Sequence, residues 1–236
     1  NKMVISAAGK VDHEKFVDAI QASYTNLPNG KTKNREKAIY SAGEYREQKK
    51  LEQIHLLIGF EGIDYHNEDY YSLLIFSSLL GGGMSSRLFQ EIREKRGLVY
   101  GISSFCSSYS DTGIFGIYSG TGDSQIQELI PVLCEQLNNT PDTITEKEIN
   151  RGKAQLKASL MMGRESAFRR CEIAARQLLV FDRLIEPKEI LNKIDQVNIN
   201  TVRNISKKIL TKPMTISSIG PIEKLEKLEN IQSRLL

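Results

Sequence analysis

Three strand-like segments, with helical segments between and after them, constrain the fold most. Apolar residues alternate with other residues from Ile54 to Phe60, which is the period of a strand with one buried face. Leu98–Tyr109 and Ile114–Tyr118 predict two more strands, which the turn at 110–113 joins as a hairpin. Strands in pairs with helices gathered between and after them predict an α+β fold. We expect a mostly antiparallel sheet with helices packed on one face, a two-layer sandwich.

Capping residues mark the first helices. Asp12 is expected to cap a helix that ends near residue 27, and Asn67 is expected to cap one that runs to residue 80. Ser85 or Ser86 is expected to cap a third helix, which Gly97 ends as a left-handed residue. Periodicity then predicts helices at 125–137, 146–162, 167–181, 187–197 and 201–210, a strand at 214–219 and a charged terminal helix at 222–228.

The first residues resemble the last ones. Met3–Gly9 has the pattern of a buried strand, and both it and Met214–Gly220 end in glycine before a helical pattern. This similarity indicates a protein of two related halves. Because residue 1 is Asn and the chain opens within a predicted strand, we expect the rear portion of a longer protein; a processed terminus or residual tag is the alternative.

Composition excludes several classes of protein. No apolar run reaches the roughly 18 residues that suggest a membrane span. The net charge is only +3, and no basic face is interleaved with aromatic residues, so we expect no nucleic-acid partner. Cys106, Cys134 and Cys171 are odd in number and far apart, which argues against a disulfide framework and a thiolate zinc site. They suit the cytoplasm or another reducing compartment.

The segment Leu79–Tyr100, LLGGGMSSRLFQEIREKRGLVY, carries the functional information. Its glycine run allows a close approach of the backbone. Arg93 lies on the last turn of the predicted helix and Tyr100 at the start of the next strand, with Gly97 turning the chain between them. A guanidinium and a phenol that converge there suit a carbonyl oxygen that gains charge during a reaction.

Each part of this segment also has a purely structural interpretation. Three glycines usually only stop a helix, Arg93 alone is more often solvated, and Tyr100 alone is more often a half-buried strand aromatic. A phosphate-binding loop would need the pattern GxxxxGK[ST], which is missing here. His13, His55 and His66 lack zinc-ligand spacing, so we expect no metal site in this chain.

Taken together, the run from Gly81 to Tyr100 resembles the pitrilysin or insulinase-type zinc metallopeptidases, in particular the mitochondrial processing peptidase branch. Residues 4–13 resemble the strand and turn that end the first half of these proteins. Residues 53–60 resemble the first long strand of the second half, and the hairpin before Phe115 fits as well. The resemblance covers nearly the whole chain.

The resemblance implies a division of labour. An N-terminal half, outside this chain, would carry an H-x-x-E-H zinc motif whose Glu activates water. This chain would supply the substrate-holding wall, with Arg93 and Tyr100 near the scissile carbonyl and Gly81, Gly82 and Gly83 against the substrate. Residues 1–28 would then end the preceding half, 29–41 would be a linker, and 42–236 would be the C-terminal domain. The fragment alone should bind no zinc and hydrolyse nothing.

The expected partners are a peptide or presequence substrate and the N-terminal half, with a homo- or heterodimer possible. Two alternatives stay open at this stage. One is a non-catalytic subunit or core-type scaffold of the same fold, whose other half has lost the zinc motif. The other is an unrelated α+β binding module. Upstream sequence separates the first alternative from the enzyme, and the fold separates the second from both.

Overall fold

The computed structural model describes residues 3–27, 30 and 36–235. The chain forms two compact units: residues 1–37 with 157–192, and residues 38–156 with 193–236. Residues 29 and 31–35 of the predicted linker at 29–41 lie outside the described residues, and the division at 28 and 41 stays a prediction. No helix in the described part of the chain combines the length and hydropathy that a membrane span requires.

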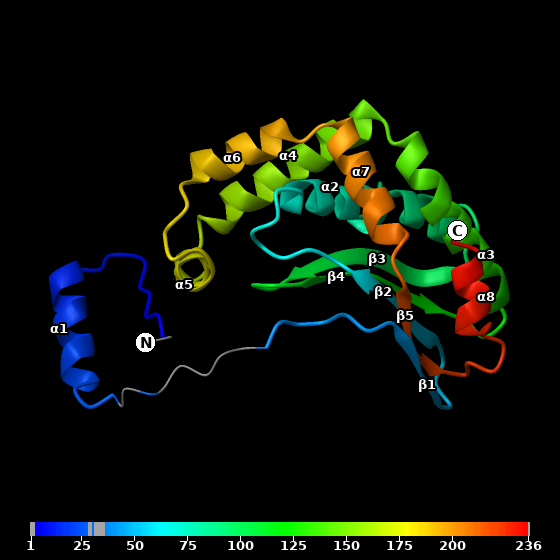
Figure 1. Cartoon of the computed structure of the whole chain (residues 1–236), viewed down its shortest axis with the longest axis horizontal. Helices are drawn as coiled ribbons and strands as arrows, with labels where there is room; N and C mark the ends of the chain where they lie inside the picture. The colour runs from blue at the N-terminus through cyan, green and yellow to red at the C-terminus, as the bar shows by residue number, and fades with distance from the viewer. Residues whose placement is uncertain (1–2, 28–29, 31–35, 236) are drawn as a thin grey trace. The chain divides into compact units, whose positions relative to one another are not determined.

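The second unit contains a five-stranded sheet (Figure 1). Its strands, in spatial order, are β1 (Gly43–Gln48), β5 (Met214–Gly220), β2 (Ile54–Glu61), β4 (Gly113–Thr121) and β3 (Val99–Ser108). Strands β1 and β5 are parallel, and the other neighbours are antiparallel. The predicted α+β fold with a mostly antiparallel sheet is therefore confirmed, and β1 is an addition that the sequence pattern did not predict.

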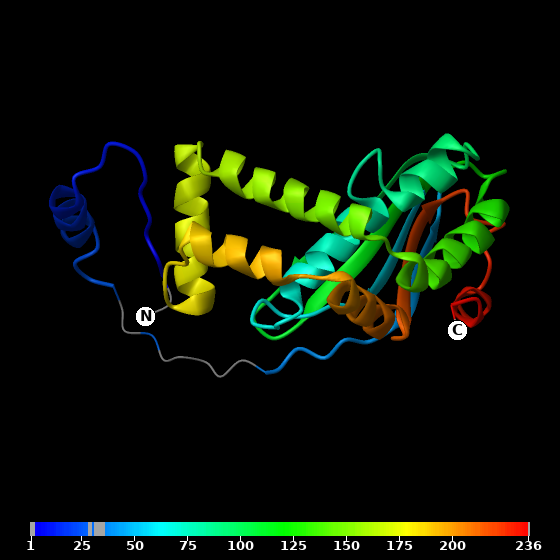
Figure 2. The ribbon, with the colours of Figure 1, turned by 90° about the horizontal axis from the view of Figure 1, so that it is seen from above.

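The core lies between one face of the sheet and the helices α2 (Tyr70–Gly81), α3 (Ile126–Thr143) and α7 (Ile199–Leu210) (Figure 2). Alternate residues of β2 from Ile54 to Phe60 are buried there, while His55 and Leu57 between them are only half-buried. The ring of Phe115 lies 6.3 Å from that of Phe60 and 5.4 Å from that of Phe76, between centroids. The alternation of apolar residues along β2 therefore corresponds to a sheet with one face buried in the core.

The remaining helices follow the predicted periodicity closely. Asp12 caps α1, since its carboxylate accepts a hydrogen bond from the Lys15 amide at 3.2 Å, although α1 ends at Ser23 rather than near residue 27. Helix α5 has the predicted bounds. The helices outside the core layer are α1 (His13–Ser23), α4 (Glu146–Gly163), α5 (Ala167–Phe181), α6 (Pro187–Gln196) and α8 (Leu228–Ser233).

The predicted opening strand is wrong. Residues Met3–Gly9 form no strand, and Met3 is 57% exposed. An apolar pattern makes a strand possible, but a strand exists only when a neighbour satisfies its main-chain groups. Within the described residues, nothing pairs with this segment.

Two predicted helix starts are also wrong. The Asn67 side chain accepts from the Asp69 amide at 3.0 Å, so it forms a turn before α2 and does not cap the helix. The terminal helix begins at Leu228 because Gly220 has φ +135° and the Ile222 amide donates back to its carbonyl at 2.9 Å. In both places a local turn competes with the first hydrogen bonds of the predicted helix, so the helix begins later in the chain.

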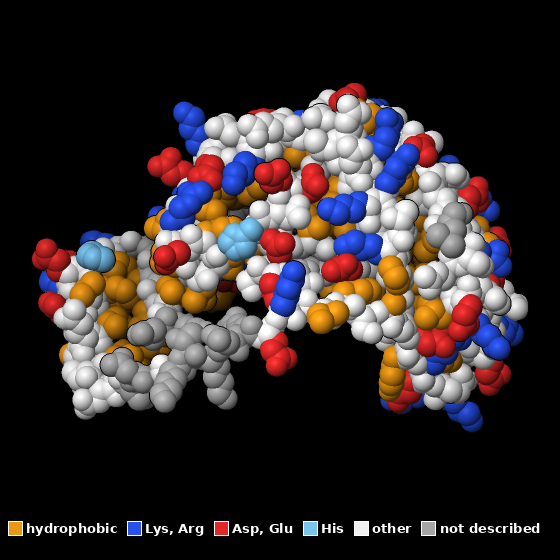
Figure 3. All heavy atoms as spheres, viewed as in Figure 1, with side chains coloured by type: hydrophobic (Ala, Val, Ile, Leu, Met, Phe, Trp, Pro, Cys, Tyr) orange, Lys and Arg blue, Asp and Glu red, His pale blue; other side chains and the backbone are white. Residues whose placement is uncertain are grey.

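Charge is well mixed on the face that Figure 3 draws, where Lys and Arg side chains are interspersed with Asp and Glu over the sheet-bearing unit. This distribution agrees with the small net charge of +3. Neighbouring opposite charges partly cancel each other's field, and salt screens what remains beyond about one Debye length, roughly 8 Å at physiological salt. The mixed charge of this face therefore creates no long-range field of one sign.

Cys106 and Cys134 are expected to differ in reactivity from an ordinary exposed thiol. Burial raises the pKa of the Cys106 thiol to about 12 and that of Cys134 to about 11. Because the thiolate is the nucleophile, we expect both to resist a thiol reagent near neutral pH in the native protein. Peptide mapping after labelling measures this, with labelling in denaturant as the control; rapid native modification of Cys106 would contradict the burial.

Candidate functional site

A π-helical turn replaces part of the third predicted helix. In η1 (Phe89–Glu94) the Lys95 amide donates to the Gln90 carbonyl at 3.0 Å, five residues back. Ser86 lies directly before the first helical residue, as predicted, and its carbonyl accepts from the Gln90 amide at 3.0 Å, but its hydroxyl donates to the Gly83 carbonyl at 2.6 Å. The wide turn keeps Ile92 fully buried and leaves the next residue, Arg93, at the surface. Single π turns occur often at functional sites.

Gly97 ends this turn as predicted. Its φ is +64°, in the left-handed region that favours glycine, and its amide donates to the Arg93 carbonyl at 3.1 Å. The chain then enters β3 only two residues later. The glycine therefore brings the last helical turn and the start of β3 together.

A β-bulge at the start of β3 contains Tyr100. Val99 pairs with Thr121 and Gly101 with Gly120, so Tyr100 is an extra residue without a partner on β4. The Arg93 side chain binds this bulge, since its Nε donates to the Tyr100 carbonyl at 2.9 Å. The structure therefore joins the two predicted site residues through the side chain of Arg93 and the main chain of Tyr100.

The Tyr100 side chain extends to the surface, where it is 67% exposed. The Arg93 guanidinium also contacts Glu94 at 3.1 Å and lies 4.7 Å from the centre of the Phe89 ring. These contacts hold the guanidinium beside the bulge. That the guanidinium and the phenol bind a common substrate atom stays a prediction.

The glycine run has two structural roles. Gly81 ends α2 where the helix passes over β3, and a Cβ at this position would lie 2.8 Å from Ser104 Oγ and closer still to its amide nitrogen. Gly83 has φ +153°, and Gly82 continues the helical bonding by donating to Ser78 at 3.0 Å. Among the described residues, no hydrogen bond or ion pair connects the glycines with Arg93 or Tyr100.

Substituting Gly81 by alanine is expected to destabilise the fold by about 2 kcal/mol, since the methyl group must push α2 away from the β3 backbone. Urea denaturation of the variant measures the change. Gly163→Ala is the matched control, because no atom lies within 4 Å of a Cβ there. Equal stability of the two variants would contradict the close packing of α2 on β3.

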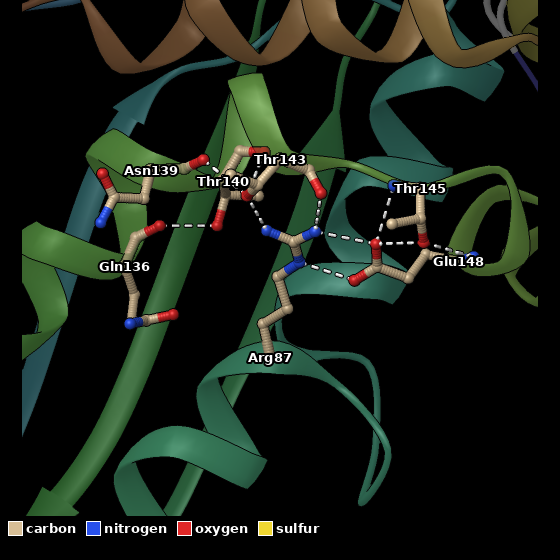
Figure 4. Close-up of polar contacts among 7 residues, drawn as sticks. All are labelled: Arg87, Gln136, Asn139, Thr140, Thr143, Thr145 and Glu148. Atoms are coloured by element: carbon tan, nitrogen blue, oxygen red, sulfur yellow. Dashed lines mark hydrogen bonds and ion pairs between the residues drawn. The ribbon is translucent and has the colours of Figure 1, made fainter.

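Arg87 forms the most extensive polar network near this segment (Figure 4). Its Nε and one terminal nitrogen donate to the two Glu148 carboxylate oxygens at 2.6 and 2.8 Å. That same terminal nitrogen also donates to the Thr143 carbonyl at 2.7 Å, and the other terminal nitrogen donates to Thr143 Oγ1 at 2.6 Å. The network therefore ties the segment after α2 to the end of α3 and the start of α4.

Burial of the Glu148 carboxyl would raise its pKa, but the hydrogen bonds from Arg87 and Thr145 and the Arg87 charge together outweigh burial. They lower the pKa of Glu148 to about 2. Both side chains are largely buried, at 18% and 15% exposure. The sequence did not predict this pair, because 61 residues separate its members and no local pattern around Arg87 or Glu148 indicates the other.

The described residues do not fit a zinc site. They contain no group of three or more His, Cys, Asp or Glu side chains placed to hold a metal ion. His55, one of the three histidines, instead shares a hydrogen bond of 2.7 Å between its Nδ1 and the Tyr118 hydroxyl. No step of a reaction is therefore assigned to a metal held by this chain.

Comparison with known proteins agrees with the resemblance. Residues 1–156 match the family described as "Peptidase M16 inactive domain". An uncharacterized zinc protease of Rickettsia felis is 36% identical over 220 residues, which are 93% of this chain and 53% of that protein. The uncharacterized zinc protease YmxG of Bacillus subtilis is 34% identical over 94% of this chain and 54% of its own length.

More distant similarity extends to mitochondrial proteins. The mitochondrial-processing peptidase subunit alpha of Solanum tuberosum is 27% identical over 99% of this chain and 49% of its own length. A chain of complex III2 from Candida albicans has the same fold, with a TM-score of 0.87, 24% identity, and coverage of 96% of this chain and 57% of that one. The chain thus spans about half the length of the curated relatives it matches.

The family match over residues 1–156 agrees with the observed fold, a mostly antiparallel sheet backed by helices. This chain belongs to the M16 peptidase family, as a domain of the type described as inactive.

Proposed function

We propose that this chain is the C-terminal, substrate-holding part of a zinc-dependent endopeptidase that processes peptides or presequences. The proposal rests on family membership and on curated relatives that are named zinc proteases and extend over about twice its length. In this proposal, the other half of the intact protein carries the H-x-x-E-H motif and the zinc. Arg93 and Tyr100 contact the substrate carbonyl near the scissile bond, and Gly81, Gly82 and Gly83 border the substrate.

The hydrogen bond from Arg93 to the Tyr100 carbonyl is the observation that carries this proposal. It supports a pre-organised pair, because the bulge and the guanidinium each restrict the other before a substrate arrives. Donors that are already in place cost no reorganisation when charge develops on a carbonyl oxygen. The exposed phenol of Tyr100 is free to reach such a ligand.

We further propose that residues 1–28 end the preceding half, 29–41 link the halves, and 42–236 form the C-terminal domain. A repeated local turn supports this division. Gly9 has φ +124° and accepts from the Val11 amide at 3.0 Å, while Gly220 has φ +135° and accepts from the Ile222 amide at 2.9 Å. Gly220 ends the strand β5, and the same turn at Gly9 would mark the end of the preceding half.

A peptidase assay of the intact protein tests the proposed function. We expect hydrolysis of an unfolded peptide, loss of hydrolysis with a chelator, and its return with added zinc, while residues 1–236 alone hydrolyse nothing. An H-x-x-E-H motif in the upstream sequence is the matching expectation from sequence. Peptide hydrolysis that persists in chelator would contradict the zinc-dependent mechanism.

A non-catalytic subunit or scaffold is the second candidate function. The description of the matched domain as inactive supports this candidate. An upstream half without the zinc motif would establish it. Either candidate can form a homo- or heterodimer, which light scattering of the intact protein measures. A reducing compartment, cytoplasmic or other, stays a prediction for both.

A further inference from the structure

A cavity of about 310 Å³ lies within the first compact unit, residues 1–37 with 157–192. Its walls come from helix α5, from the loops on both sides of α5, and from the segment before α1. Small-molecule sites in proteins measure about 300–1,000 Å³. The cavity therefore has room for a small ligand, at the lower end of that range.

One face of α5 forms the first wall. Arg170, Ile173, Ala174 and Gln177 line the cavity, and their spacing of i, i+3, i+4 and i+7 places them on one side of the helix. Along this face a cation comes first, two apolar side chains follow, and an amide comes last. The wall therefore changes from charged to apolar to polar over two helical turns.

The segment after α5 forms the second wall. Asp182 ends the helix in the left-handed conformation, with φ 55°, and its amide donates to the Leu178 carbonyl at 3.1 Å. The Ile185 amide then donates to Gln177 Oε1 at 3.0 Å. This hydrogen bond holds residues 184–187, all of which line the cavity, against α5. It also leaves the NH₂ group of Gln177 as a donor without a partner among the described residues.

The third wall consists of two alanines, Ala7 and Ala8. Gly9 follows them with φ +124°, and its carbonyl accepts from the Val11 amide at 3.0 Å, so the chain turns directly after this wall. The two methyl groups add apolar surface and occupy little space. Together with the apolar residues of the other walls, they make the space between the charged groups suitable for an apolar ligand group.

Three charged side chains line the cavity, those of Arg164, Arg170 and Glu186. In the part of the chain that the structure describes, none of these three side chains forms a hydrogen bond or an ion pair. By contrast, Arg176 of the same helix α5 pairs with Glu172 at 2.9 Å. Two guanidinium groups and one carboxylate are therefore available to bind charged groups of a ligand.

The opposite charges belong to opposite ends of the cavity. Arg170 and Gln177 are seven residues apart, which is roughly 10 Å along a helix that rises about 1.5 Å per residue. Arg164 precedes α5, on the side of Arg170, whereas Glu186 follows the residue whose amide binds Gln177. A ligand that uses both signs of charge must therefore carry its own two charges several ångströms apart.

From this lining we infer that the cavity binds an apolar dipeptide in its zwitterionic form. The carboxylate would bind Arg164 and Arg170, since a guanidinium can donate to both oxygens of one carboxylate. The ammonium group would bind the Glu186 carboxylate, and the two side chains would lie between, against the apolar walls. An inorganic anion would leave the apolar walls and the carboxylate without a function.

The length of the ligand follows from the separation of the charges. Two extended residues span about 7 Å, and flexible arginine and glutamate side chains can bridge the remaining distance to each end. A single amino acid carries both charges on one carbon atom and cannot reach both ends. The inference goes beyond the proposed function, because it concerns none of the residues proposed to hold the substrate and does not require the intact protein to be a peptidase.

Isothermal titration calorimetry of the full chain with leucyl-leucine tests the inference. Three matched compounds each lack one feature: the dipeptide amide lacks the carboxylate, the N-acetylated dipeptide lacks the ammonium group, and glycylglycine lacks the apolar side chains. We expect each of them to bind at least about tenfold more weakly than leucyl-leucine, since each loses one charge-assisted or apolar contact. In NMR spectra, leucyl-leucine should shift the signals of Ile173 and Ala174.

Variants of the lining residues locate the binding. Arg164→Gln, Arg170→Gln and Glu186→Gln are each expected to weaken the binding of leucyl-leucine by about tenfold. Ala174→Leu fills the apolar space, keeps all three charges, and should reduce binding by a similar factor or more. Arg176→Gln is the matched control, because Arg176 does not line the cavity, and it should bind like the wild type.

Four results would overturn the inference. Phosphate or acetate that binds as tightly as leucyl-leucine would show a site for simple anions. Unchanged affinity for the amide or the acetylated compound would show that the charged ends are not recognised. An equal loss of binding in Arg176→Gln would show a general effect of charge, and absence of any binding would end the inference outright. None of these results concerns the roles proposed for Arg93 and Tyr100.

Discussion

Replacing Tyr100 by Phe, or Arg93 by Gln, in the intact protein is expected to lower kcat for peptide hydrolysis by about 10²-fold for each variant. A factor of that size corresponds to about 2.7 kcal/mol of lost transition-state stabilisation and is typical of removing one donor to a developing oxyanion. Steady-state kinetics on one peptide measures it. Because neither residue is proposed to bind metal, the zinc content should stay at the wild-type value.

The two variants should differ in structure, which separates a direct contact from positioning. Tyr100→Phe removes only the phenolic hydroxyl, whereas Arg93→Gln also removes the hydrogen bond that holds the bulge. We therefore expect the arginine variant alone to shift the amide signals of Val99–Gly101. Arg96→Gln, on the neighbouring exposed turn, and Tyr109→Phe, at the far end of the same hairpin strand, are the matched controls.

Activity at the wild-type level in Tyr100→Phe and Arg93→Gln would refute their proposed role. Loss of zinc together with activity would refute it as well, since the effect would then come from the metal site. A fall in activity of the Arg96→Gln control by the same factor would show that positive charge in general, and not the group at position 93, supports hydrolysis. Unchanged activity, loss of zinc and an equal effect of Arg96→Gln thus point to three different explanations.

Replacing Arg87 by Met is expected to lower the free energy of unfolding by about 3 kcal/mol. The substitution removes four hydrogen bonds and leaves the Glu148 carboxylate, only 15% exposed, without its cation. An unpaired charge in a largely buried position costs far more than an exposed ion pair contributes. Urea denaturation measures the loss. Arg176→Met, which breaks an exposed pair with Glu172, is the matched control and should cost far less.

The same pair predicts how stability depends on pH. Because the pKa of Glu148 is lowered to about 2 in the folded protein, its contribution is fully present above its ordinary value of about 4.5. It is lost progressively as pH falls from there toward about 2, since the unfolded chain then binds the proton first. Glu148→Gln should therefore lose less stability than the wild type between about pH 5 and pH 3. Parallel curves for the two proteins would contradict the assignment.

Local patterns in the sequence predicted most of the elements correctly. The hairpin of β3 and β4, the alternation of β2, the bounds of α5 and the left-handed Gly97 all depend on residues that are close together in the chain. Periodicity, capping side chains and glycine conformations act over a few residues, so the sequence displays them directly. The segment from Gly81 to Tyr100 likewise identified the family before the fold was known.

Features that depend on distant residues followed only from the tertiary structure. Strand β1 exists because β5, about 170 residues later, supplies its hydrogen bonds, whereas Met3–Gly9 has a better strand pattern and no partner in the described residues. The Arg87–Glu148 pair and the bulge at Tyr100 are likewise set by which segments meet. Sequence determines what a segment can become locally, but a strand or a largely buried ion pair exists only once the folded chain supplies its partner.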